Sequence, residues 1–181
     1  MQNSAKDPLL IFARFLLMFF IVALGIAGAA LLAALPVMLF KQADLLAQLA
    51  EKGAQAGPEL ITAASFVLVG TSGLIALGIY FLMLLRRIVN SVGKGDPFVP
   101  ENAQRLSRMG WVGIILQVAG VPVGYAVMWI SNIAADAGEN IHGGSEFGFS
   151  GGGILLVLTL FILSRVFRTG TEMREDLEGT I

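Results

Sequence analysis

The chain of 181 residues contains no cysteine and only one histidine. Disulfide bonds, thiolate chemistry and cysteine-ligated metal sites are therefore excluded, and His142 cannot form a metal site by itself. Charged residues are also scarce, at 14% of the chain, whereas soluble domains contain about 25%. Hydrophobic residues make up 56% of the chain, which is more apolar surface than a soluble domain of this length can bury. The excess must contact lipid or another protein.

Four long stretches lack Asp, Glu, Lys, Arg and His altogether, at residues 15–40, 60–85, 109–135 and 147–164. A helix needs roughly 20 mainly apolar residues to cross the hydrocarbon of a bilayer. The first stretch is longer than the about 7–15 apolar residues of a secretion signal, so we interpret it as a retained helix. We predict spans at about residues 15–40, 60–85, 109–133 and 149–167, separated by outer loops at 41–59 and 134–148.

Basic residues are distributed very unevenly between the two sides of these spans. Ten of the twelve Lys and Arg residues precede the first span, follow the second or follow the fourth. Basic residues accumulate on the cytoplasmic side of a membrane, and two ends on one side require an even number of spans. The predicted fold is therefore all-α: an integral membrane four-helix bundle, a single transmembrane domain over residues 1–181, with cytoplasmic N- and C-termini.

Small residues within the spans predict close approach of the helices, because lipid tails leave no hydrophobic drive for association. The third span contains a GxxxG pair, Gly120 and Gly124. Packing within the bundle is the favoured interpretation, and a seam between copies in a homo-oligomer is the alternative.

The second outer loop gathers Asp136, Glu139, His142 and Glu146 among glycines. A metal site is one interpretation of these side chains. Their irregular spacing favours a solvated acidic loop, and we predict neither a metal nor any other cofactor.

The segment between the second and third spans, residues 86–108, is called the elbow below. The second helix is expected to continue past Arg87 and to end at Gly93 or Gly95, since glycine commonly terminates helices. A turn at 96–98 follows, and Pro100 suits the first position of the next helix. The elbow is thus predicted to be structured, with Phe98 folded back against the bundle or the membrane.

Residues 168–181, called the tail below, begin basic and end acidic. We expect acidic side chains of the tail to pair with arginines of the elbow. The acids are Glu172, Glu175, Asp176 and Glu178, and the arginines are Arg86, Arg87, Arg105 and Arg108.

Elbow and tail resemble those of a bacterial family of four-helix inner-membrane proteins, catalogued as a domain of unknown function. The family pattern Gly-x-Pro-Phe-x-x-x-Asn-x-x-Arg-Leu falls here on Gly95, Pro97, Phe98, Asn102, Arg105 and Leu106. The Phe-Arg-x-Gly tail, its acidic stretch and its end fall on Phe167, Arg168, Gly170, Glu175, Asp176, Thr180 and Ile181. The resemblance implies a bacterial inner membrane and, because family genes often lie beside one for a small helix-turn-helix protein, a cytoplasmic partner of that kind.

No nucleophile–base pair is visible, so we expect a protein that is not an enzyme. The net charge of −1 gives no reason to expect direct nucleic-acid binding. The leading hypothesis is a membrane regulator or sensor that engages a small cytoplasmic partner through the elbow, including Arg108, and the tail. The alternatives are an oligomeric transporter or pore for small solutes and a structural subunit of a larger membrane complex.

Overall fold

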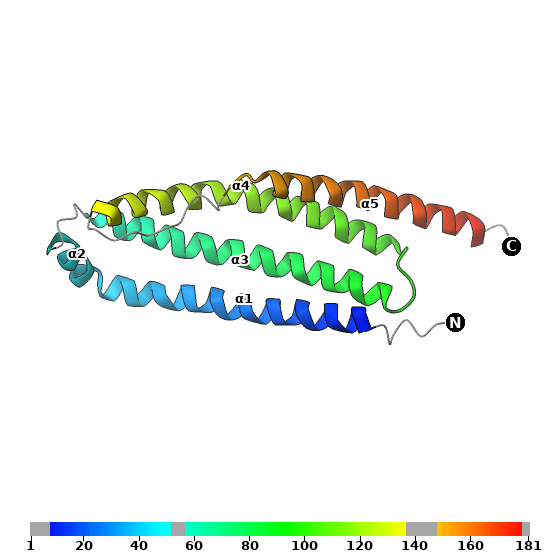
Figure 1. Cartoon of the computed structure of the whole chain (residues 1–181), viewed down its shortest axis with the longest axis horizontal. Helices are drawn as coiled ribbons and strands as arrows, with labels where there is room; N and C mark the ends of the chain where they lie inside the picture. Colours follow the sequence, from blue (N-terminus) through cyan, green and yellow to red (C-terminus); the bar gives the residue numbers. More distant parts are fainter. Residues whose placement is uncertain (1–7, 52–56, 137–147, 179–181) are drawn as a thin grey trace. The chain divides into compact units, whose positions relative to one another are not determined.

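The computed structural model describes residues 8–51, 57–136 and 148–178. These ranges contain five helices and no strand (Figure 1). The helices are α1 (Pro8–Phe40), α2 (Gln42–Glu51), α3 (Pro58–Val92), α4 (Pro100–Asp136) and α5 (Gly151–Glu178). All but α2 are long and apolar enough to cross a membrane, which confirms the predicted all-α fold with four spans.

The long helices extend beyond the uncharged stretches that predicted them. Helix α3 continues through Arg86 and Arg87 to Val92, and α5 continues through Arg165 and Arg168 into the tail. Arginine is a good helix former. A lack of charge therefore marks the part of each helix suited to hydrocarbon, whereas α3 itself ends at Val92, just before the glycines at 93 and 95.

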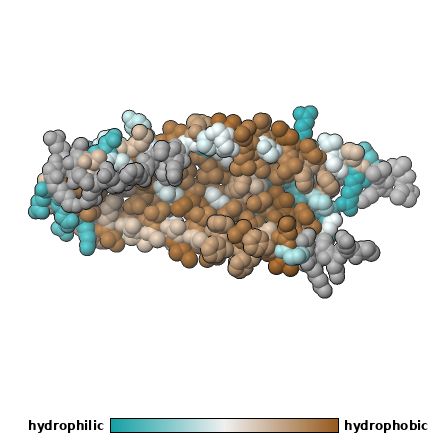
Figure 2. Space-filling model, in the orientation of Figure 1, coloured by the Kyte–Doolittle hydropathy of each residue, from teal (hydrophilic) through white to brown (hydrophobic). Residues whose placement is uncertain are grey.

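Most apolar side chains of the long helices are not buried by the protein itself. Phe12, Phe15 and Phe19 of α1 are all exposed, as are Leu155 and Leu158 of α5. On the face shown in Figure 2, hydrophobic residues cover the middle portions of these helices. Such a surface suits lipid as its surroundings, because it would be an aggregation liability in water.

By their internal packing, the helices divide between two compact units. The first, called the elbow unit, takes in Met1–Leu24, Leu77–Ile115 and Ser150–Ile181. It thus includes the start of α1, the elbow with its flanking helices, and α5. The second, called the α2 unit, takes in Gly25–Ala76 and Leu116–Phe149.

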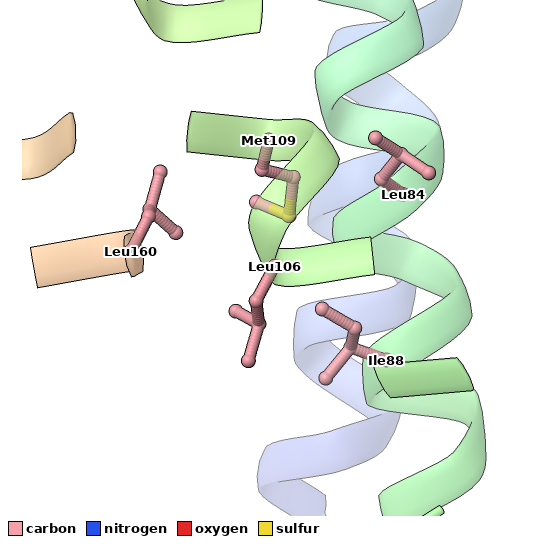
Figure 3. Packing of buried hydrophobic residues seen from close by; sticks show 5 residues of the cluster. All are labelled: Leu84, Ile88, Leu106, Met109 and Leu160. Carbon is pink, nitrogen blue, oxygen red and sulfur yellow. The ribbon is translucent and has the colours of Figure 1, made fainter. Parts of the chain in front are cut away.

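The core of the elbow unit lies where α3, α4 and α5 meet (Figure 3). Its buried members are Leu84, Ile88, Leu106, Met109 and Leu160. Close contacts at glycines bring α4 and α5 together beside this core: a Cβ on Gly113 would lie 2.7 Å from Val157 Cγ2. The core therefore holds the two helices that flank the elbow and the helix that carries the tail in one unit.

In the α2 unit, small residues lie where the helices approach each other. Gly120 and Gly124 of α4 are both buried, and Val123 between them lies against Gly70 of α3. Gly28 of α1 faces Ile75 of α3 in the same way, at 3.3 Å for an added Cβ. Glycine at these positions lets the helix backbones come close.

Candidate functional site

The elbow begins with a glycine-based helix end. The N–H of Gly95 donates to the Val92 carbonyl at 2.9 Å, and the N–H of Asp96 donates to the Ser91 carbonyl at 3.3 Å. Gly95 has a φ of 84°, in the left-handed region that disfavours side chains. This is the Schellman arrangement, which satisfies the last carbonyls of a helix and turns the chain away from its axis. It accounts for glycine at position 95.

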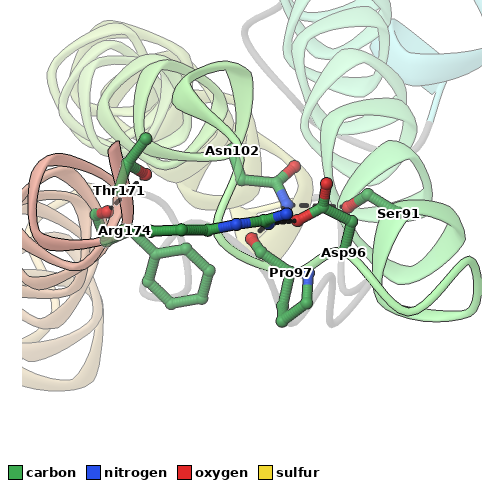
Figure 4. A network of polar contacts seen from close by, with 7 residues as sticks. Ser91, Asp96, Pro97, Asn102, Thr171 and Arg174 are labelled. Atoms are coloured by element: carbon green, nitrogen blue, oxygen red, sulfur yellow. Dashed lines mark hydrogen bonds and ion pairs between the residues drawn. The ribbon is translucent and has the colours of Figure 1, made fainter. Parts of the chain in front are cut away.

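The side chain of Asn102 holds the turn in place (Figure 4). It is 0% exposed, and its Nδ2 donates to Ser91 Oγ at 2.7 Å and to the Pro97 carbonyl at 2.8 Å. Its Oδ1 accepts a hydrogen bond of 2.6 Å from the guanidinium of Arg105. Buried polar groups are costly unless they are paired, and here both amide hydrogens and the oxygen have partners. Asn102 thereby joins the end of α3, the turn and the first turns of α4.

The tail helix packs on this turn through an aromatic contact. The rings of Phe98 and Phe167 lie 5.3 Å apart, a distance typical of favourable aromatic pairs. The same Phe98 ring covers Gly170, where an added Cβ would come within 2.9 Å of it. The absence of a side chain at Gly170 is what lets the ring lie against α5.

An ion pair closes the same contact one turn further along α5. Arg174 donates to a carboxylate oxygen of Asp96 at 2.5 Å, and Figure 4 shows the arginine reaching across from α5 to the turn. The expected pairing placed the acids on the tail and the arginines on the elbow. This pair has the opposite sense, and Arg105, one of the expected arginines, instead bonds Asn102. Asp96 lies in the turn that follows the end of α3, and its carboxylate lies beside the tail helix.

A second polar link lies nearer the core. The buried hydroxyl of Ser164 in α5 donates to the Ala103 carbonyl in α4 at 2.8 Å. Ala103 is in the first turns of α4, next to Asn102, so this bond ties α5 to the same few residues. We call the contacts described so far the elbow–tail joint. They join residues between Ser91 and Arg105 to one another and to residues between Ser164 and Arg174.

Helix α1 also reaches the end of α3. The guanidinium of Arg14 lies against the backbone of Gly93, which is buried. A cation is favourable at the C-terminal end of a helix, where the carbonyl dipoles concentrate negative charge. The Nε atom of Arg14 is buried with no hydrogen-bond partner among the described residues. Arg14 thus joins the first span to the elbow.

Three hollows open on the surface of the elbow–tail joint. One, of about 550 Å³, is mainly apolar and lies along α5 under Phe98, with Arg165 as its charged residue. A second, of about 260 Å³, lies between the start of α4 and the tail and includes Gln104, Arg168 and Glu172. A third, of about 480 Å³, shares Arg168 and Glu172 with the second. We call the second and third hollows together the polar groove. The first hollow is called the apolar groove.

The structure brings most residues of the predicted site together. Those within the elbow–tail joint are Gly95, Pro97, Phe98, Asn102, Arg105, Phe167 and Gly170. Arg108, Arg168 and Asp176 are exposed, whereas Gly120 and Gly124 belong to the α2 unit. The side chain of Glu175 and residues 180 and 181 lie outside the described residues, as do Glu139, His142 and Glu146 of the acidic loop. Within the described ranges, no three His, Cys, Asp or Glu side chains group as metal ligands.

Sequence reasoning did not identify Ser91, Ser164 or Arg174 as parts of this joint. Ser91 stands four residues before the positive-φ glycine, where its hydroxyl can meet the returning α4. That spacing is a usable signal. Ser164 and Arg174 bond residues 61 and 78 positions away in sequence, and a single sequence gives no indication of such pairs.

The fold and the joint define a multi-pass membrane protein in which four spans carry a structured elbow and a docked tail helix. A comparison with family profiles matches residues 48–181 to the family described as "Protein of unknown function (DUF2975)". The chain belongs to this family, which confirms the resemblance to an uncharacterised family. The comparisons with curated proteins and with solved structures found no match.

Proposed function

We propose that the protein is a membrane regulator that binds a small cytoplasmic protein through the polar groove. The observation that carries the proposal is the contrast between a joint whose buried polar groups bond one another and an open groove beside it. Asn102, Ser164 and their partners are satisfied internally, so they fix the tail on the elbow. Arg168 and Glu172 line the groove and are exposed.

This assignment moves the contact residues away from the most distinctive sequence positions. Asn102 is fully buried and Arg105 bonds it, so neither is placed to meet a partner. The elbow pattern is better explained by the Schellman turn, the buried amide and the Phe98 contact than by direct recognition. Recognition falls instead to Gln104, Arg168 and Glu172, which offer an amide and both signs of charge.

Mixed charge in a groove of this kind favours a partner that presents complementary charges in a fixed register. Complementary charges across an interface contribute chiefly to specificity and to the rate of encounter. The resemblance implies that this partner is a small helix-turn-helix protein. Binding to the groove would then let the membrane protein control the partner's binding to DNA. The excess of basic residues in the elbow unit supports a cytoplasmic elbow and tail, and the resemblance implies that the membrane is a bacterial inner membrane.

The test is co-purification of the full chain, in lipid nanodiscs, with a small helix-turn-helix protein from the same genome. We expect Arg168→Glu and Glu172→Lys each to reduce the amount of partner recovered by about tenfold. Each substitution reverses a charge, so that it repels the partner's charge that it had attracted. Arg87→Glu is the matched control, since it reverses an exposed arginine of α3 outside the groove. Recovery equal to wild type in both groove variants, or no complex with the wild-type chain, would refute the proposal.

A further inference from the structure

The apolar groove lies along the last part of the fourth span. Its walls include Ile162, Val166 and Met173 of α5, with Phe98 of the elbow on the other side. Val166 is 55% exposed, Met173 62% and Phe98 42%. These are large apolar side chains left uncovered beside a hollow of about 550 Å³, which is within the usual size range of ligand pockets.

The length of α5 puts the groove across the boundary between hydrocarbon and lipid headgroups. Hydrocarbon about 30 Å thick corresponds to about 20 residues of helix, at 1.5 Å per residue. The span candidate in α5 runs from Gly151 to Arg174. Counted from Gly151, the hydrocarbon ends near Gly170, so Ile162 lies within it and Met173 lies beyond it. The groove therefore leads from the acyl chains outward to the interface.

The charge at the groove matches an anionic headgroup. Arg165 is the charged residue among those lining the hollow, and it is exposed. An arginine at this depth extends its head toward the interface while its methylene stem covers apolar surface. Guanidinium groups bind phosphate with paired hydrogen bonds. An amphipathic peptide from a cytoplasmic partner fits less well, because about half of the groove lies on the hydrocarbon side of the interface.

We propose that the apolar groove binds one anionic phospholipid. An acyl chain lies along Ile162 and Val166 beneath the Phe98 ring, and the phosphate meets Arg165. The bound lipid covers the apolar side of the elbow–tail joint, next to the polar groove, whose third hollow shares Arg165 and Thr169 with the apolar groove. This inference does not depend on the proposed partner, because the contacts with that partner are assigned to Gln104, Arg168 and Glu172, and none of these residues lines the apolar groove.

The test is native mass spectrometry of the full chain in detergent, titrated with phosphatidylglycerol or with phosphatidylcholine of the same acyl chains. We expect phosphatidylglycerol to be retained in preference, and Arg165→Gln to lower its occupancy about fivefold, the effect of one basic residue near a membrane surface. Arg87→Gln, an exposed arginine of α3 outside the groove, should leave occupancy unchanged. Val166→Trp should fill the groove and reduce retention of both lipids.

Equal retention of the two lipids would overturn the proposal, as would equal effects of Arg165→Gln and Arg87→Gln. Unchanged occupancy in Val166→Trp would show that lipid binds elsewhere and would likewise overturn it. A dimer that Val166→Trp abolishes, without selective lipid retention, would identify a second copy of the chain as the occupant instead. Binding of the helix-turn-helix protein is measured separately, so failure of either proposal leaves the other open to its own test.

Discussion

Asn102 is buried among three partners that an apolar side chain could not satisfy. Ser91, Pro97 and Arg105 each place a polar atom within 2.8 Å of its amide group. Because the hydroxyl of Ser91 can also donate to the Ile88 carbonyl, the amide completes a short chain of hydrogen bonds into α3. At the scale of the residue, this side chain holds the path from α3 to α4 that the glycine turn at 95 begins.

Replacing Asn102 with alanine should therefore destabilise the elbow unit. The change leaves the Pro97 carbonyl and the Arg105 guanidinium without their partner, and an unmet buried polar group costs about 1–3 kcal/mol. A loss of this size lowers the Tm of a chain of this length by about 2–12 °C. The measurement is thermal unfolding in detergent, with Gln104→Ala as the control because Gln104 is exposed two residues away. Equal Tm values for the two variants would contradict the role given to Asn102.

At the scale of the element, glycine positions distinguish helix faces that touch from faces that do not. In α3, a Cβ added at Gly70 would lie 2.7 Å from Cγ2 of Val123, whereas one added at Gly73 meets nothing within 4 Å. Val123 is 3% exposed and β-branched, so its side chain has little freedom to move away. The two glycines are three residues apart in the same helix and differ mainly in this contact.

We predict that Gly70→Ala destabilises the α2 unit and that Gly73→Ala does not. Both substitutions replace glycine with a better helix former, so the backbone gain cancels in the comparison. The remaining difference is overpacking against Val123, which costs about 1–3 kcal/mol. Thermal unfolding of the two variants side by side in one detergent measures it. Should Gly70→Ala prove as stable as Gly73→Ala, the close contact between α3 and α4 is not as described.

The elements were predictable to the extent that local chemistry determines them. Uncharged stretches predicted the four spans. The glycines at 93 and 95 and the proline at 100 predicted the turn within the elbow, where α3 ends at Val92 and α4 begins at Pro100. The family pattern indicated which elbow residues matter. It did not indicate how they act, because partners such as Ser91, Phe167 and Arg174 come from other helices. The pairing of Arg174 with Asp96 was unpredictable for this reason, since the abundance of acids in the tail suggested the reverse.

At the scale of the whole molecule, the two compact units differ in charge. The elbow unit contains ten Lys and Arg against seven Asp and Glu, whereas the α2 unit contains two against six. The excess of basic residues at the elbow is what the positive-inside rule associates with the cytoplasm. Four spans then return the chain to the side on which it began, so the tail shares the side of the elbow.

The lack of cysteine makes this orientation directly testable. Single cysteines at Gln42, just after the first span, and at Glu101, in the elbow, change neither the count of Lys and Arg nor a buried side chain. In intact spheroplasts, a membrane-impermeant maleimide should label Gln42→Cys and should label Glu101→Cys only after lysis. The unmodified chain gives no background. The reverse pattern would place the elbow outside, and the polar groove would then be out of reach of any cytoplasmic partner. The proposed regulator depends on this orientation more than on any other feature, because a partner in the cytoplasm can reach only a cytoplasmic groove. The orientation itself is inferred from ten basic residues on one side of the spans against two on the other.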